Sequence, residues 1–322
     1  MRFTIGAAML ALCLQATAQE QKPLPAALVE ALNKVAGGEH EGFRANHAKG
    51  VMVSGTFTPS AQAKSLSKAP HFQKAVPVTV RFSNATGVPN MPDGDPNARP
   101  HGMATRFQLP GGQTTDIVCI SANSFPVATP EDFLALLQAV AASGPNAAKP
   151  TPVEKFLSTH PAAMKFVTTP RPAPQSFGTL AFFGVNAFKF TNAKGESKFT
   201  RYQILPVAGE HALPADAKPA PNYLMDELPA RVAKGPVKFR LLVQVANEGD
   251  NTTDPTVSWP ATNKVVELGV ISLDKVLPNQ VLAQKTILYN PVQLPEGIEP
   301  SADPVLAMRF PAYAVSFGQR AK

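Results

Sequence analysis

The chain shows two kinds of apolar pattern, and helical spacing is confined to a few segments. Apolar residues recur at helical spacing across 24–35 and two glycines follow, which predicts an amphipathic helix there. Thr129 is a capping residue, Pro130 suits the first helical position and acidic residues fill the first turn, so a second helix is predicted to begin here. Asp303 is likewise a capping residue, and Pro304 after it suits the first helical position, so a C-terminal helix is predicted to begin there.

Elsewhere the pattern is that of strands, in which short blocks of β-branched and aromatic residues lie between clusters of Pro, Gly and Asn. The predicted strands cover 51–57, 76–82, 103–109, 116–120, 182–190, 198–205, 237–246, 265–273 and 282–289. The turn at 192–195 tolerates the positive φ angles of a tight reversal and predicts a hairpin. Residues 144–176 are rich in Pro and Ala, with one helical patch at 153–157, and predict a long surface connection. Because about eight strands can close a barrel, we expect an α+β fold built on an antiparallel eight-stranded β-barrel with helical additions.

The first eighteen residues have the pattern of a secretory signal. Arg2 precedes an apolar run over 3–14, and small residues at 16–18 offer a cleavage site. The run is too short to span a bilayer and no later stretch is long enough without charges, so we expect no membrane anchor. These features predict a periplasmic or secreted protein, with a signal peptide at 1–18 and one domain at 19–322.

Charge and cysteine content narrow the class of protein. Loss of Arg2 with the signal would reduce the net charge from +7 to +6, and no run of Lys and Arg with interleaved aromatic residues is present. This diffuse charge favours general solubility over nucleic-acid binding. Without Cys13, the mature chain has only Cys119, so an internal disulfide is excluded and the domain must depend on its core.

Three short motifs contain the residues with candidate chemistry. They are Phe-Arg-Ala-Asn-His-Ala-Lys-Gly at 43–50, Val-Arg-Phe-Ser at 80–83, and Arg-Phe-Pro-Ala-Tyr at 309–313 followed by Arg320. With the segments at 254–260 and 295–301, they give the chain an ordered resemblance to the haem catalase family from about residue 38 to the C-terminus. The short length and the signal peptide look most like the small catalase-related peroxidases.

In that family, the position matched by His47 belongs to the distal histidine, on the haem face where peroxide reacts. The resemblance implies that His47 takes a proton from the peroxide oxygen nearest the iron and returns it to the departing oxygen. An imidazole suits both steps, because its ordinary pKa near neutrality lets it act as base and then as acid. Ser83 matches the serine that hydrogen-bonds this imidazole and fixes its tautomer. Asn123 is the nearest candidate for the distal asparagine that orients peroxide, but extra residues precede it, which favours peroxidase over catalase turnover.

Tyr313 matches the proximal ligand, whose phenolate oxygen donates charge to ferric iron on the opposite face. Arg309 lies four residues earlier, hence on the same face of a helix, and its positive charge lowers the cost of making a phenolate. Pro311 between them removes a helical hydrogen bond and is expected to kink the axis. The implied cofactor is haem b, with its iron bound by Tyr313.

Further positions of the resemblance concern the rest of the cofactor. Arg44, Arg81 and Arg320 match three residues that bind the haem propionates, where a guanidinium fork can pair two oxygens. Phe133 matches an aromatic residue that packs beside the haem, although its place in the apolar stripe of a helix also fits ordinary core. His101 stands where catalases usually have an arginine, and we give it no catalytic role.

The leading interpretation is a haem peroxidase that reduces hydrogen peroxide or organic peroxides with small organic electron donors. Alternatives are a true catalase, which would release oxygen without a donor, and a non-enzymatic haem carrier or sensor, which would need Tyr313 but hardly His47. A haem-free barrel for an apolar ligand is a third alternative. The chain is shorter than the large catalases, so we expect a monomer or small homo-oligomer rather than their interlocked tetramer.

Overall fold

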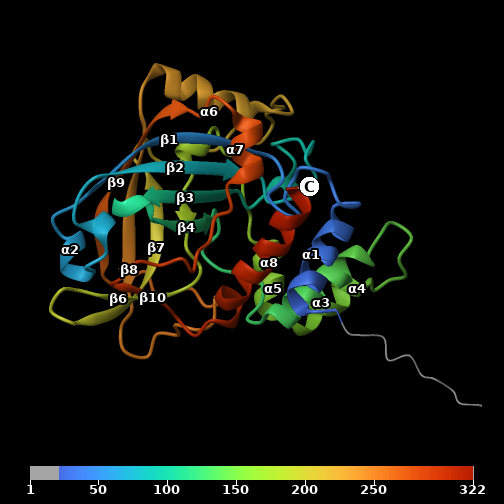
Figure 1. The fold of residues 1–322 in the computed structure, drawn as a ribbon. Coiled ribbons are helices and arrows are strands. Elements are labelled where there is room, and N and C mark those ends of the chain that lie inside the picture. The colour runs from blue at the N-terminus through green and yellow to red at the C-terminus, as the bar shows by residue number, and fades with distance from the viewer. Residues whose placement is uncertain (1–21, 322) are drawn as a thin grey trace, which may run out of the picture.

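The strands of the pattern pair into one antiparallel sheet in the computed structural model of the protein, which describes residues 22–321. Eight strands close into a barrel, because β7 pairs with both β5 and β8 (Figure 1). These strands are β1 (Gly50–Pro59), β2 (Val76–Ser83), β3 (Gly102–Gln108), β4 (Thr114–Ile120), β5 (Phe182–Phe183), β7 (Ser197–Pro206), β8 (Val237–Val245) and β9 (Val265–Val276). Two short strands, β6 (Phe188–Thr191) and β10 (Ile298–Pro300), extend the sheet beside β7. The predicted fold class is confirmed.

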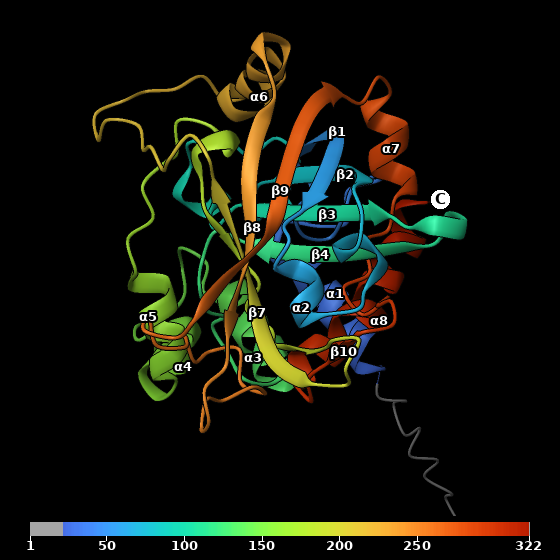
Figure 2. The same ribbon diagram turned by 90° about the vertical axis from the view of Figure 1, so that its left-hand side faces the viewer.

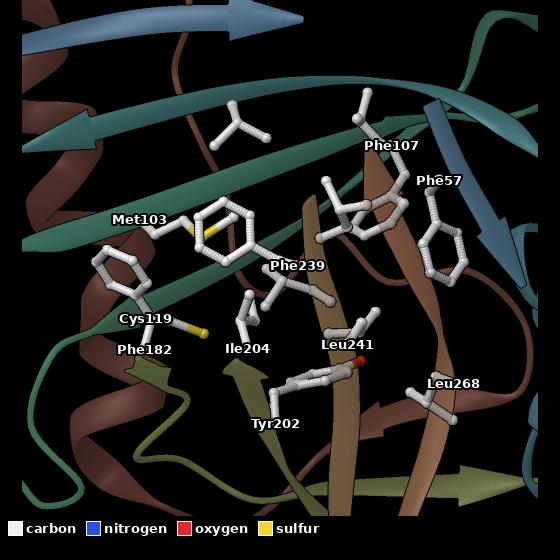
Figure 3. Close-up of a cluster of buried hydrophobic side chains, with 14 of the residues drawn as sticks. Phe57, Met103, Phe107, Cys119, Phe182, Tyr202, Ile204, Phe239, Leu241 and Leu268 are labelled. Atoms are coloured by element: carbon white, nitrogen blue, oxygen red, sulfur yellow. The ribbon is translucent and has the colours of Figure 1, made fainter. Parts of the chain in front are cut away.

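Alternation of side chains along the strands fills the interior of the barrel. In β2, Val80 and Phe82 belong to the buried core, whereas Arg81 and Ser83 lie on the opposite face of the strand. Figure 3 shows aromatic and aliphatic side chains from several strands meeting in the interior, Phe107 and Phe239 among them. This packed core holds the ends of the strands in a fixed register, on which the candidate site depends.

The helices lie outside the barrel. They are α1 (Leu24–Val35), α2 (Ala63–Leu66), α3 (Pro130–Ala141), α4 (Pro152–Thr159), α5 (Pro161–Thr168), α6 (Tyr223–Lys234), α7 (Gln280–Thr286) and α8 (Pro304–Arg320). Helices α1, α3 and α8 pack together at one side of the barrel, whereas α6 lies apart from them (Figures 1 and 2). A second apolar cluster joins α1 and α3 through Leu28, Ala31 and Leu137, and Met308 of α8 packs against it. Within residues 22–321, no helix has both the length and the apolar character needed to cross a membrane.

Local signals at the helix ends account for three of these helices. The predicted helix at 24–35 is confirmed as α1, and the Thr129 hydroxyl accepts a hydrogen bond from the Asp132 amide at the start of α3. Asp303 caps α8, which continues unbroken through Pro311. The connection at 144–176 contains α4, which covers its predicted helical patch, and also α5, which the pattern does not predict.

The predicted strand at 282–289 is wrong, because most of this segment forms α7 and the remainder is irregular. The Asn279 side chain caps the helix, and two glutamines one turn apart then bond to the start of β1. Gln280 bonds to both the amide and the carbonyl of Met52, and Gln284 donates to the Gly50 carbonyl. These contacts with β1 outweigh the β-propensity of the apolar residues in the segment.

The predicted strand at 182–190 is divided into β5 and β6. Between them, the Gly184 amide donates to the Tyr202 carbonyl, and Asn186 turns toward α8 to bond with Asp303 and Arg309. The hairpin at 192–195 is confirmed, with Gly195 at a φ of 83°. Helix α6 is absent from the predicted elements because Pro229 interrupts its helical pattern.

Candidate active site

A cavity lies between the strand ends at one side of the barrel and the helices α1, α3 and α8. Its volume is about 1410 Å³, including the open space at its mouth. Much of the wall is apolar and comes from the helices, with Leu28, Val29, Val305 and Met308 among the lining residues. Eight of the nine residues predicted to form the site line this cavity, namely Arg44, His47, Arg81, Ser83, Phe133, Arg309, Tyr313 and Arg320.

The register of three strands positions His47. Ser83, at the end of β2, pairs with Gly50 of β1 on one side and with Gly102 of β3 on the other. His47 lies just before β1, and its Nδ1 is 3.0 Å from the Ser83 hydroxyl oxygen. Because this contact occupies Nδ1, the other ring nitrogen, Nε2, is left for chemistry in the cavity.

The two glycines beside Ser83 provide the space that the polar side chains occupy. A Cβ at Gly102 would lie 2.8 Å from the Ser83 hydroxyl oxygen and 2.9 Å from two atoms of the His47 ring. A Cβ at Gly50 would lie 2.6 Å from the central carbon of the Arg81 guanidinium group. Neither residue could carry a side chain without displacing a group of the site.

The environment of His47 favours its neutral form. Burial, followed by the positive charge of Arg81, lowers the pKa of His47 to about 3. The backbone of His47 has a φ of 55°, in the left-handed region that residues other than glycine seldom adopt. Strain of this kind persists where the surrounding contacts hold it, as the Ser83 contact and the tight fit against Gly102 do here.

Helix α8 places Tyr313 at the start of a partly buried chain of hydrogen bonds. Arg309 Nε donates to the Tyr313 hydroxyl oxygen at 3.1 Å, so both side chains lie on the same face of the helix despite Pro311. Arg309 Nη1 donates to Asn186 Oδ1 at 2.7 Å, and Asn186 Nδ2 donates to Asp303 at 2.7 Å. Arg309 is therefore fixed in orientation, with its positive charge against the phenol.

Three arginines meet at another part of the cavity. Arg44 and Arg320 each donate to the Ile287 carbonyl at 2.9 Å, and Arg81 donates to the carbonyls of His47 and Ala48. Burial lowers the pKa of Arg44 to about 10 and that of Arg320 to about 9, and the pKa of Arg81 is also lowered. Among residues 22–321, none of the three forms an ion pair with an acidic side chain.

This arrangement fits the haem that the sequence resemblance implies. Adjacent buried cations without counter-ions are costly, and the Arg320 Nε is buried without a hydrogen-bond acceptor, so the cluster suits a ligand that carries carboxylates. The apolar walls suit a large flat ring, and the Tyr313 oxygen is an oxygen donor for ferric iron. Phe133 lines the wall and packs against Phe125 with the two rings tilted by 55°, and with 5.1 Å between ring centroids.

Two other residues lie outside the cavity wall. Asn123 is exposed, and its backbone carbonyl accepts a hydrogen bond from the Ser258 hydroxyl, so the structure does not bring its amide to His47. His101 is fully buried against Phe177 and does not line the cavity. Asn46, which precedes His47, is instead a carboxamide residue on the wall.

Sequence reasoning missed three residues that shape the site, Gly102, Asn186 and Tyr289. The signal for Gly102 was its place directly before the strand predicted at 103–109, since a glycine at a strand can indicate close approach of another group. Asn186 lay inside a stretch predicted to be a regular strand, and Tyr289 inside another. Both errors in secondary structure therefore concealed residues of the cavity.

Comparison with known proteins bears on both family and fold. The family model for catalase matches residues 20–321. A catalase-related peroxidase from Mycolicibacterium paratuberculosis is 38% identical over 286 residues, covering 87% of this chain and 90% of its own. Another from Synechococcus elongatus is 34% identical over 293 residues, covering 88% and 85%. The crystal structure of a fungal catalase matches with a TM-score of 0.78 at 22% identity, over 88% of this chain and 60% of that chain, which shows a shared fold.

Proposed function

The chain belongs to the catalase family, and from this membership we propose that it is a haem-dependent peroxidase. Its substrates would be hydrogen peroxide or organic peroxides, reduced at the expense of small organic electron donors. The observation that supports this most strongly is that three sets of residues with different chemical roles line one cavity. These are His47 with Ser83, Tyr313 with Arg309, and the cluster of Arg44, Arg81 and Arg320.

We propose haem b as the cofactor and assign its contacts to residues of the cavity. Tyr313 would bind the iron through its phenolate oxygen, and the fixed charge of Arg309 would stabilise that phenolate. The three clustered arginines would bind the propionates, and Phe133 would pack beside the ring. When bound, the haem iron supplies the redox chemistry of peroxide reduction.

The role of His47 is to move one proton between the two oxygens of peroxide. In the neutral form, its Nε2 can accept the proton from one peroxide oxygen and then donate it to the departing oxygen. The Ser83 contact at Nδ1 keeps the ring in one orientation between these two steps. The lowered pKa keeps the imidazole neutral before peroxide arrives.

Peroxidase turnover is favoured over catalase turnover by two observations. The relatives with the highest identity reported above are named catalase-related peroxidases. Asn123, the candidate amide for orienting peroxide in efficient disproportionation, is exposed outside the cavity wall. A small organic electron donor would therefore complete the cycle more readily than a second molecule of peroxide.

We further propose that the protein is exported to the periplasm or secreted and acts as a monomer or small homo-oligomer. Support for export comes from Arg2, the apolar run at 3–14 and the small residues at 16–18. That segment lies outside the described residues.

The decisive test uses the mature chain expressed with added haem. We expect stoichiometric haem, and oxidation of a donor dye that depends on peroxide, with little oxygen release when the dye is omitted. His47→Ala should lower the peroxidatic kcat/KM about 100-fold or more while the ferric spectrum is largely kept. Tyr313→Phe should change the ferric spectrum or cause loss of haem.

His211→Ala is the matched control, because His211 is exposed and outside the cavity wall. A purified protein without haem would refute the proposed cofactor. A His47→Ala protein as fast as the parent would refute the proton-transfer role of His47.

A further inference from the structure

The hydroxyl group of Tyr289 is buried in the wall of the cavity without a hydrogen-bond partner. The residue is 6% exposed, and among the described residues none lies within hydrogen-bond reach of its oxygen. Buried tyrosine hydroxyl groups usually have a partner, because leaving one unpaired in a folded protein costs about 1–3 kcal/mol. Since Tyr289 also lines the cavity, the missing partner is expected in a ligand.

The ring of Tyr289 is held rigidly from behind by an ion pair. Arg106 makes two bonds to Asp116, of 2.8 and 2.7 Å, and its guanidinium carbon lies 5.3 Å from the centre of the Tyr289 ring. Both neighbours in the chain are tied to this pair, because Arg106 donates to the Leu288 carbonyl and the Asn290 amide donates to Asp116. The hydroxyl is therefore positioned in advance and cannot move far to find another partner.

The charges around Tyr289 determine which kind of group it can bond. Burial raises the pKa of Tyr289, so the hydroxyl keeps its proton and acts as a donor. Arg44 and Arg81, which act on it from the cavity side, have donors only. Asp116, whose charge also acts on Tyr289, does not serve as the acceptor, because it is not within hydrogen-bond reach of the hydroxyl. The proton of Tyr289 needs an acceptor from the ligand, and the neighbouring cations favour an anionic one.

We propose that Tyr289 is a fourth carboxylate-binding residue of the haem site, donating a hydrogen bond to a propionate held by the arginine cluster. The proposal rests on the proposed haem function and adds a neutral donor to the three cations. It also accounts for a costly buried hydroxyl that the proton-transfer steps leave unused.

The test compares two forms of the cofactor on the same apo-protein. Haemin carries two free carboxylates, whereas haemin dimethyl ester has the same ring with both carboxylates neutralised. Binding is followed by titration of the Soret band, and dissociation by transfer to an excess of apomyoglobin. The variants are Tyr289→Phe, which removes only the hydroxyl group, and Tyr202→Phe, which alters another buried tyrosine outside the cavity wall.

Tyr289→Phe should weaken the binding of haemin by about ten-fold to one hundred-fold, the range for a lost hydrogen bond to a charged acceptor. Binding of the dimethyl ester should change less than about two-fold, because the ester is a weaker, neutral acceptor. Tyr202→Phe should bind both forms as the parent does.

The stability of the apo-protein separates a ligand-binding role from a structural one. If Tyr289 is kept for its ligand, apo Tyr289→Phe should unfold at the same or a higher urea concentration than the parent, because the unpaired hydroxyl is gone. Lower stability of the apo variant would indicate a structural role and overturn the proposal.

Equal weakening of both haemin forms, or no weakening of either, would also overturn it. Failure of the parent protein to bind haemin at all would instead refute the proposed function. The two failures are therefore distinguishable.

Discussion

At the residue scale, the close approach of His47, Ser83 and Gly102 is the most constrained part of the site. The imidazole lies against the backbone of Gly102 and its Nδ1 is bonded to Ser83. The position of the His47 ring therefore depends on residue 102 being a glycine, which has no side chain. The backbone of His47 is held in a left-handed conformation and has little freedom to adapt.

Gly102→Ala should therefore displace the imidazole without removing it. The new Cβ would lie within 2.9 Å of both side chains, and the Ser83 contact would lengthen or break. We expect peroxidatic kcat/KM to fall at least about ten-fold, because proton transfer depends on donor–acceptor geometry. Haem content and the ferric spectrum should be unchanged.

Gly144→Ala is the control for Gly102→Ala, since a Cβ at Gly144 has open space around it. Stopped-flow rates with hydrogen peroxide give the comparison. Full activity in Gly102→Ala would show that His47 does not need its observed position.

At the element scale, the structure explains which predictions from the sequence succeed. Thr129 and Asp303 carry their own capping side chains, so α3 and α8 could be located from local signals alone. The motif residues of the site were likewise found from the order of short segments. The segment at 282–289 could not be assigned locally, because its helix depends on bonds from Gln280 and Gln284 to a strand more than 200 residues earlier.

The break between β5 and β6 has a functional consequence for α8. It lets Asn186 join Arg309 to Asp303, so a side chain from the barrel fixes the arginine that contacts Tyr313. Asn186→Ala should leave Arg309 without this acceptor and allow its guanidinium group to move from the phenol oxygen.

We expect the haem-loaded Asn186→Ala protein to show a ferric spectrum with less phenolate character and to lose haem faster than the parent. Unfolding free energy should fall by about 1–3 kcal/mol, because the buried Asp303 also loses a partner.

Asn192→Ala is a suitable control, since this hairpin asparagine is also buried and hydrogen-bonded but lies outside the cavity wall. It should lose stability while keeping the parent spectrum. Identical spectra for Asn186→Ala and the parent would contradict the positioning role.

At the scale of the whole molecule, the barrel buries two histidines that serve no part of the proposed reaction. His71 lies among Phe57, Phe72 and Phe107, and His101 lies against Phe177. Both nitrogens of each ring are buried without hydrogen-bond partners. Burial lowers the pKa of each to about 3 from the ordinary 6.5, so both stay neutral in the folded protein.

This difference makes the folded state sensitive to acid. Between pH 6.5 and about 3, the unfolded chain binds a proton at each of these histidines and the folded chain does not. The free energy of unfolding therefore falls as the pH is lowered, by about 1.4 kcal/mol per pH unit for each histidine well below pH 6.5. Above pH 6.5, neither residue contributes a slope.

Replacing His71 by Phe tests this account, because a phenyl ring suits the aromatic neighbours and cannot be protonated. Urea unfolding of the haem-loaded variant and parent at pH 7, 6, 5 and 4 gives the two slopes, and His47 contributes equally to both. The variant should lose stability less steeply below pH 6.5, by about 1.4 kcal/mol per pH unit. His211→Gln, at an exposed site, should follow the parent. Parallel curves for His71→Phe and the parent would mean that His71 is protonated equally in both states, and that acid sensitivity arises elsewhere in the barrel.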